Sequence, residues 1–338
     1  MSTPTAASGS PPAAHGLQRL SQLAFLRFLF SGFRGDFAPW FEKITQYPLG
    51  FETRFLGQRL ILMNEPDGIE ELLEKNQKYY HRRSQSTPLK IYTGQSVLTI
   101  SGEAHLRQRR LMQPAFSKKR IDAYGDTMVE LAEAHAVRWR DGAVVDIHEE
   151  MLEVTAAIIT KTIFSSEIEE DVRIVGESID ALLSNTKRYV VPVLGRVLDR
   201  LPLKSTRQVK KALTDLDTVI YRFIEEHRAA GESMDDLLSM LVAARYDDGS
   251  AMTDKQLRDE SMTIFLAGHE TTATALSWTF YLLSQHPEIA ERLRAEVDSV
   301  LAGGRAPTLE DFPRLDYTRR VLTESMRMYP PVPGADRQ

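Results

Sequence analysis

The chain has 338 residues, of which 42% are hydrophobic and 26% charged, as in an ordinary globular protein with an apolar core. Its net charge of −5 argues against a protein whose main role is to coat nucleic acid or an anionic membrane surface. It has no cysteine, which excludes disulfides, zinc–thiolate sites, iron–sulfur clusters and a cysteine nucleophile within these residues.

The N-terminal part begins with residues 1–16, which are rich in Ser, Thr, Pro and Ala and predict a disordered tail. The domain is therefore expected to cover residues 17–338. No basic segment precedes an apolar one, so no secretory signal is expected. Residues 23–30 are the most apolar early stretch, far below the roughly 20 residues of a spanning helix. We interpret them as a buried amphipathic helix, with a membrane-surface helix as the alternative, and expect a cytoplasmic protein without a transmembrane segment.

The next segment predicts a strand pair over residues 51–63, turned at Gly57-Gln58, because β-branched and aromatic residues lie on both arms. After Pro66 the pattern becomes helical, with capping residues and prolines at the helix ends. The predicted helices cover residues 69–75, 119–140, 149–164, 172–184, 205–228, 234–245, 253–285, 287–301 and 313–328. The fold class is therefore mainly α with a minor N-terminal β region, and no Gly/Ser-rich linker divides it.

The longest predicted helix, residues 253–285, is apolar on most sides and is expected to be buried. Its middle carries Ala267 and Gly268, then Glu270 and Thr271. Ala267, Thr271 and Ala275 recur at every fourth residue, and with Gly268 beside them they form a narrow stripe of small side chains on which a flat ligand could lie. We expect the Thr271 hydroxyl to bond back to the Ala267 carbonyl, which would open a polar notch beside an acid in an apolar wall. The alternative is a core helix whose small residues let a neighbouring helix pack closely.

Two further clusters lie on either side of this helix in the sequence. His105 and Arg109 are four residues apart, so they share one helix face and suit the gripping of carboxylates or phosphates, unless the face is simply solvated. Glu324 and Arg327 are three residues apart and can form an ion pair on one helix face, just before a proline-rich segment. Zinc-protease, P-loop, dinucleotide-binding and nucleophile-elbow motifs are missing from the sequence.

In this order and setting, the clusters resemble those of the cytochrome P-450 family of haem–thiolate monooxygenases over nearly all of residues 17–337. Residues 267–272 resemble the oxygen-activation motif in the family's long central helix. Glu324-x-x-Arg327 resembles its Glu-x-x-Arg helix, and Tyr-Pro-Pro follows at residues 329–331. The resemblance implies the cytochrome P-450 fold and a haem-dependent oxidoreductase that inserts one oxygen atom of O2 into a small lipophilic substrate.

The resemblance also implies roles for the oxygen side of the haem. Glu270 and Thr271 would be catalytic, passing protons through water to iron-bound dioxygen. Ala267 and Gly268 would lie across the haem face as part of the cofactor-binding wall.

For the rest of the haem site, the resemblance implies that His105, Arg109 and Arg337 bind the propionates. Glu324 and Arg327 would be structural, holding the wall behind the other side of the haem.

The sequence departs from the family at the metal ligand. The family's iron takes a cysteine thiolate from a loop downstream of the Tyr-Pro-Pro segment. This chain has no cysteine and ends at Gln338. We therefore expect a cytochrome P-450 fold that is incomplete at its C-terminus, no metal ligand within the chain, and no thiolate-assisted oxygen activation by these residues alone.

Partners follow from the same resemblance. An electron-donor redox protein is expected, and the basic run from Arg107 to Arg120 is a candidate to attract an acidic one. No nucleic-acid partner is expected. The alternative function is a non-catalytic helical fragment that binds an apolar ligand or holds haem loosely.

Overall fold

The computed structural model describes residues 17–33, 44, 46–55, 57–80, 89–165, 169–185, 200–201, 203–231, 236–335 and 337. By its contacts the chain divides into two compact units, Met1–His81 and Arg82–Gln338. The predicted tail, residues 1–16, lies outside the described residues.

The first unit holds a three-stranded sheet in the order β1-β2-β3. β1 (Gln18–Arg19) pairs in parallel with β2 (Gly50–Phe55), which pairs antiparallel with β3 (Gln58–Met63). The strand pair is as predicted, but its turn is not at Gly57-Gln58, because Gln58 is the first residue of β3 and pairs with Phe55. Helix α1 (Gln22–Phe33) packs Phe25 against Phe51 of β2 in a small aromatic core, which confirms the predicted early helix. The unit ends with α3 (Pro66–Glu70), η1 (Glu71–Lys75) and η2 (Gln77–Tyr79).

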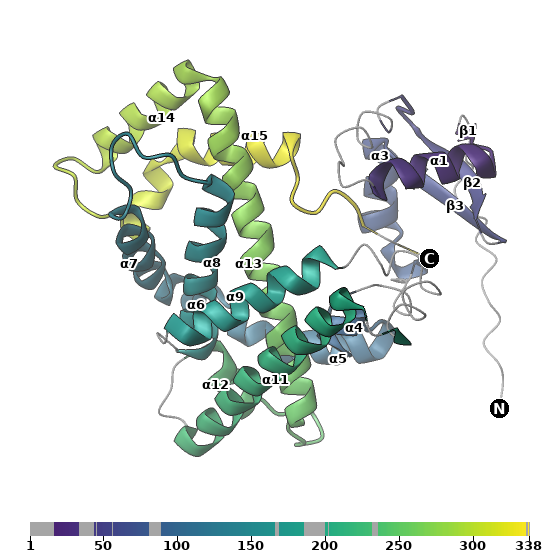
Figure 1. Ribbon diagram of the computed structural model, residues 1–338, viewed down its shortest axis with the longest axis horizontal. Coiled ribbons are helices and arrows are strands. Elements are labelled where there is room, and N and C mark those ends of the chain that lie inside the picture. Colours follow the sequence, from purple (N-terminus) through teal and green to yellow (C-terminus); the bar gives the residue numbers. More distant parts are fainter. Residues whose placement is uncertain are drawn as a thin grey trace. The chain divides into compact units, whose positions relative to one another are not determined.

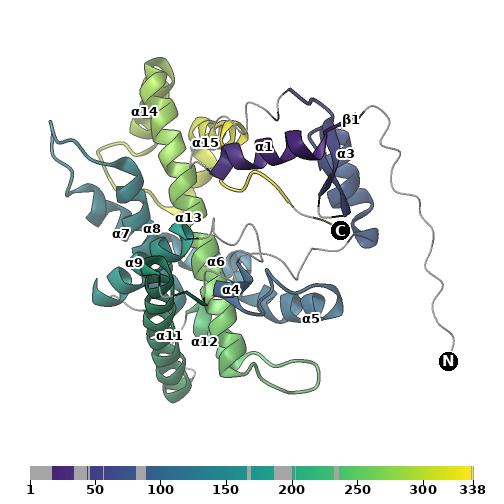
Figure 2. The same ribbon diagram turned by 45° about the vertical axis from the view of Figure 1, so that its right-hand side comes forward.

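The second unit is helical (Figures 1 and 2). Its elements are α4 (Lys90–Thr93), α5 (Gly102–Met112), η3 (Gln113–Phe116), α6 (Lys118–Ala123), α7 (Gly125–Ala136), α8 (Ile147–Phe164), α9 (Glu169–Ser184), α11 (Lys204–Ala230), α12 (Leu237–Ala243), α13 (Asp254–Gln285), α14 (Pro287–Val300), η6 (Leu309–Arg314) and α15 (Asp316–Met328). The mainly α fold class with a minor N-terminal sheet is therefore confirmed.

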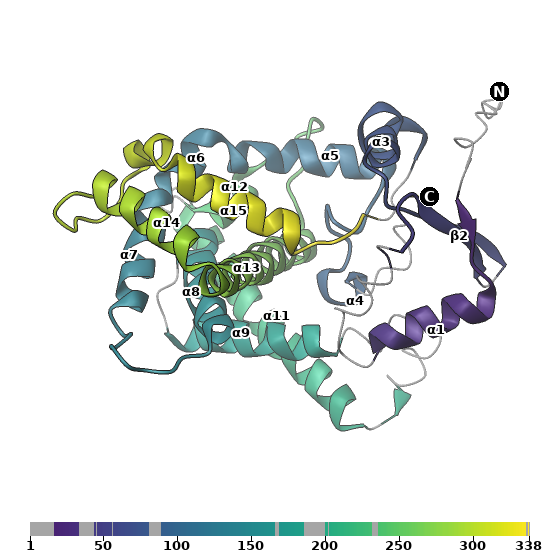
Figure 3. The ribbon, with the colours of Figure 1, turned by 90° about the horizontal axis from the view of Figure 1, so that it is seen from above.

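Helix α13 runs through the middle of this unit, with α8 packed along it (Figure 1). Viewed nearly along α13, α5 and α15 lie on one side of it, and α9 and α11 lie on the other (Figure 3). Its start is fixed by a capping box, in which Thr253 and Gln256 bond to each other's backbone N–H groups. The main apolar core lies where α8, α9, α11 and the first half of α13 meet, and includes Ile163, Leu216 and Phe265.

Three helix predictions needed correction. The helix predicted over residues 119–140 is two helices and ends at Ala136, because the Tyr124 backbone, with φ −85° and ψ −10°, departs from helix geometry between α6 and α7. The helix predicted over residues 313–328 begins at Asp316, because Pro313 lies in a 3-10 turn. The third correction concerns α13, which was predicted to be buried throughout. Its second half exposes Trp278, and its first half buries consecutive charged residues at positions 258–260.

Candidate functional site

The hydrogen bond on which the predicted notch depends is present in the middle of α13. The Thr271 hydroxyl donates a hydrogen bond to the Ala267 carbonyl, one helical turn earlier, as predicted. Ala267 and Thr272 are exposed, and Thr271 is half-buried. The small-residue stripe therefore presents an open face to whatever lies against this side of the helix.

The opposite face of the same turn is closed by α8. A Cβ atom on Gly268 would lie 2.7 Å from Cδ1 of Ile159, so glycine lets the two helices approach closely. His269 is 1% exposed, and its Nε2–H donates to the Leu152 carbonyl of α8 at 3.0 Å. Burial lowers the pKa of His269, so this imidazole is neutral near pH 7. The close-packing alternative is thus correct for the face of Gly268 and His269, which meets α8. The prediction of a ligand-facing stripe concerns the exposed face at Ala267.

Glu270 lies between these two faces and is half-buried. Burial raises the pKa of its carboxyl group, the nearby Asp180 of α9 raises it further, and His148 of α8 opposes the shift. A carboxyl group that holds its proton more tightly than usual, one residue from a hydroxyl, suits proton transfer.

The candidate propionate contacts lie on α5, which starts at Gly102 after the extended Ser101. His105 is half-buried and Arg109 is exposed. Arg109 has no ion pair to any residue in the described part of the chain, so its guanidinium is available to an external anion. Between them Gln108 is 6% exposed, a buried polar residue that the sequence reasoning missed.

The predicted Glu324–Arg327 ion pair forms on α15. It is bidentate, with distances of 2.6 and 2.7 Å, and its side chains are 56% and 69% exposed. α15 is tied to α13 nearby, because the buried Thr279 hydroxyl donates to the Ser325 hydroxyl at 2.9 Å. Arg337 is half-buried within the second unit.

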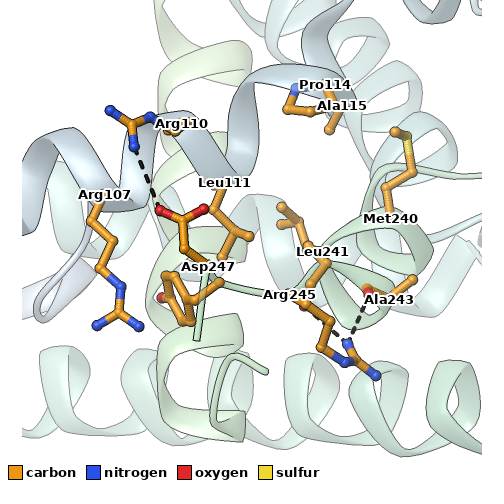
Figure 4. A pocket seen from close by; sticks show the side chains of 12 residues that line it. Arg107, Arg110, Leu111, Pro114, Ala115, Met240, Leu241, Ala243, Arg245 and Asp247 are labelled. Atoms are coloured by element: carbon orange, nitrogen blue, oxygen red, sulfur yellow. Dashed lines mark hydrogen bonds and ion pairs between the residues drawn. The ribbon is translucent and has the colours of Figure 1, made fainter. Parts of the chain in front are cut away.

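A separate groove lies between α5 and α12, with a volume of about 460 Å³ (Figure 4). Leu111 and Leu241 contribute to its apolar lining, and Arg110 lies on its rim, 3.6 Å from Asp247. Arg245 donates to the last carbonyls of α12 and so completes that helix end. None of the predicted site residues lines this groove.

The described residues show neither a cluster of metal-binding side chains nor a membrane-spanning helix. No group of three His, Cys, Asp or Glu side chains in the described ranges is arranged to hold a metal ion. No helix among the same residues is both long and apolar enough to cross a membrane.

Comparisons with known proteins identify the family of the chain. The cytochrome P-450 family model matches residues 43–338. Pentalenene oxygenase of Streptomyces avermitilis is 37% identical over 240 residues, which cover 71% of this chain and 53% of that protein. Cyclooctatin synthase of Streptomyces melanosporofaciens is 35% identical over 281 residues, which cover 82% of this chain and 61% of that protein. The chain thus spans between about half and three fifths of these relatives.

Solved structures show the same fold. A cyanobacterial structure bound to retinoic acid matches with a TM-score of 0.75 and 24% identity, over 90% of this chain and 67% of that one. The cytochrome P-450DA haem domain matches with a TM-score of 0.73 and 23% identity, over 92% of this chain and 70% of that one. The chain belongs to the cytochrome P-450 family, whose members are haem-dependent oxidoreductases that incorporate oxygen from O2.

The residues present fit two parts of the haem group. The exposed face at Ala267 suits the flat ring, and the free guanidinium of Arg109 suits a propionate. They do not include the thiolate ligand of the iron, because no cysteine occurs among the 338 residues.

Proposed function

We propose that this chain forms the oxygen-side wall and the propionate contacts of a haem-dependent monooxygenase that acts on a small lipophilic substrate. The observation that carries the proposal is the Thr271–Ala267 hydrogen bond beside a half-buried Glu270. The helix face next to Glu270 is exposed at Ala267. When bound, haem supplies the redox-active iron that activates O2. The remaining chemistry is proton delivery and positioning by the residues of this chain.

Glu270 and Thr271 are the proposed catalytic residues. The Glu270 carboxyl group holds a proton in the pH range where a free carboxylic acid has lost it, because burial raises its pKa. The Thr271 hydroxyl uses its proton for the Ala267 carbonyl, so its oxygen lone pairs are left to accept a hydrogen bond from water. Glu270 can therefore pass a proton to a water molecule that Thr271 holds in place.

The other site residues are proposed to bind and to support. His105, Arg109 and Arg337 neutralise the two propionates by charge-assisted hydrogen bonds. Glu324 and Arg327 hold α15 behind the opposite side of the group.

The substrate and the electron donor are assigned by chemistry. Pentalenene oxygenase and cyclooctat-9-en-7-ol 5-monooxygenase act, by their names, on hydrocarbon-rich compounds, which supports a lipophilic substrate. The basic segment from Arg107 to Arg120 is proposed to attract an acidic redox partner, which higher ionic strength should weaken. A cytoplasmic location also stays a prediction, which cell fractionation would test.

The deciding experiment is haemin titration of the full chain, followed by its absorption spectrum. We expect saturable one-to-one binding that weakens about ten-fold in Arg109→Ala, since one charge-assisted hydrogen bond contributes about 1.5 kcal/mol or more. Glu103→Gln, on the exposed side of α5, is the matched control and should bind haemin like the wild type. Reduction under carbon monoxide should show no thiolate signature, because the chain has no cysteine. Binding that is not saturable, or that ignores Arg109, would contradict the proposal.

The alternative is a non-catalytic helical fragment that binds an apolar ligand or holds haem loosely. The exposed aromatic side chains on the second half of α13, Trp278, Phe280 and Tyr281, favour it, because they offer an apolar surface. This alternative predicts that haemin binds weakly and equally to the wild type and to the α5 variants Arg109→Ala and Glu103→Gln, with a spectrum typical of nitrogen ligation.

A further inference from the structure

The first half of α13 buries two consecutive acids whose oxygens bind a segment far away in the sequence. Glu260 is 0% exposed, and its Oε1 accepts the Val97 backbone N–H at 2.8 Å. Asp259 is 2% exposed, and its Oδ2 accepts the Gln95 backbone N–H at 2.9 Å. Two adjacent carboxylates of α13 therefore hold residues 95–97, the segment that leads into α5.

The segment is shaped to fit these acids. Gly94 has a φ angle of +57°, and a Cβ atom there would lie 2.2 Å from Oδ2 of Asp259. Thr99 closes the turn, because its hydroxyl donates to the Gly94 carbonyl at 2.7 Å and accepts the Ser96 N–H at 3.0 Å. Glycine is required at position 94 both by the backbone conformation and by the acid behind it.

Burial raises the pKa of Glu260, and the nearby Gln108 of α5 opposes the rise, but no hydrogen bond joins the two side chains. The Gln108 amide donates to the Met252 sulfur at 3.6 Å, and its carbonyl accepts the Tyr246 hydroxyl at 2.6 Å, so this side chain is fixed from two directions. Gln108 directly precedes Arg109 and lies one turn after His105 on α5.

α5 owes its place to few other contacts with the central helix. Its backbone packs mainly against η3, which continues it, and not against α13. Glu260 precedes Gly268 by eight residues, or about 12 Å along the helix axis at 1.5 Å per residue. Glu260 thus connects α13, which carries the proposed proton-delivery residues, to the segment that leads into α5, which carries the proposed propionate contacts.

We propose that Glu260 is a positioning residue, which sets α5, and with it His105 and Arg109, at a defined place along α13 through its hydrogen bond to Val97 in the segment that leads into α5. The expected effect of Glu260 on haem binding rests on the proposed haem function, whereas its positioning of α5 does not. Glu260 touches no reacting group. It acts by holding the residues that would bind the propionates.

Hydrogen exchange of the full chain tests the positioning directly. Glu260→Leu replaces the acid by an apolar side chain of similar size and removes the oxygen that accepts the Val97 N–H. We expect exchange in residues 95–97 and 102–112 to become about ten-fold faster, as the loss of one buried hydrogen bond allows, while α8 stays unchanged. Glu260→Gln keeps an acceptor for Val97 and should restore slow exchange. The matched control is Glu288→Gln, an exposed position on α14, which should change nothing.

Haemin titration of the same variants tests the consequence. Glu260→Leu should weaken haemin binding about as much as Arg109→Ala does, and Glu260→Gln should not. If exchange in residues 95–97 and 102–112 stays slow in Glu260→Leu, or becomes faster equally in α8, the positioning proposal is wrong. If Glu260→Leu does not fold, Val97→Pro decides, because it removes the N–H that Glu260 accepts and leaves the acid in place; faster exchange of residues 102–112 is expected. If exchange changes as expected but neither Glu260→Leu nor Arg109→Ala alters haemin binding, the haem function fails while the positioning of α5 stands.

Discussion

The ionisation of Glu260 should control how the stability of the chain depends on pH. Burial raises the pKa of this carboxyl group from 4.5 to about 7, Asp259 adds to the rise, and the Val97 N–H and Gln108 amide oppose it. The folded chain therefore binds this proton more tightly than the unfolded chain does. Stability contributed by the neutral form is present at low pH and is lost as the pH rises from about 4.5 to about 7.

The size of the effect follows from the two pKa values. At 1.36 kcal/mol per pH unit, the difference between 4.5 and about 7 corresponds to about 3 kcal/mol of unfolding free energy. Glu260→Gln cannot ionise, so it should not show this loss. Its stability relative to the wild type should therefore increase by about 3 kcal/mol between pH 4.5 and pH 8.

Urea unfolding of both proteins at several pH values measures this difference, in which the other titrating groups cancel. Glu288→Gln, whose side chain is 71% exposed, should stay parallel to the wild type at every pH. Parallel curves for Glu260→Gln and the wild type would refute the reasoning, because they would show that Glu260 has an ordinary pKa in the folded chain.

Three other substitutions test separate features. His227 is 1% exposed, and its two ring nitrogens lie 2.7 Å from the Phe223 carbonyl and 2.7 Å from Asp236. Burial lowers the pKa of His227, but its hydrogen bonds to these partners outweigh burial, so the pKa is raised. His227→Gln should cost about 3 kcal/mol at pH 6, and this difference should shrink as the pH rises through the raised pKa of His227, as pH-dependent urea unfolding would show. Gly268→Ala should destabilise the wild type by about 1 kcal/mol but cost less unfolding free energy in an Ile159→Val background, because removing Cδ1 relieves the 2.7 Å contact and leaves Cγ1 at 3.3 Å, while alanine has the better helix propensity. Equal effects in both backgrounds on thermal unfolding would contradict this. Gly94→Ala should lower the free energy of unfolding by about 2 kcal/mol or more and speed proteolysis near residue 95. Gly142 also has a positive φ but has open space around it, so Gly142→Ala should lower the free energy of unfolding only by the backbone strain of about 1–2 kcal/mol.

Interactions within one or two helical turns were predictable from the sequence. The Thr271–Ala267 hydrogen bond and the Glu324–Arg327 ion pair join residues three or four positions apart, so helix geometry alone brings them together. The strand pair at residues 50–63 and the start of α13 at Thr253 follow equally local rules of pairing and capping. The resemblance to the family rested on such local motifs, which is why it could be seen without the fold.

Contacts between distant segments needed the tertiary structure. Val97 and Glu260 are 163 positions apart, and nothing in the local pattern distinguishes this buried acid from a solvated one. Gly268 looked like part of a ligand-facing stripe, but the space beside it is filled by Ile159 of α8. Sequence periodicity tells which residues share a helix face, whereas only packing decides what each face meets, because a helix can turn any face toward its neighbours at little cost until side chains interlock.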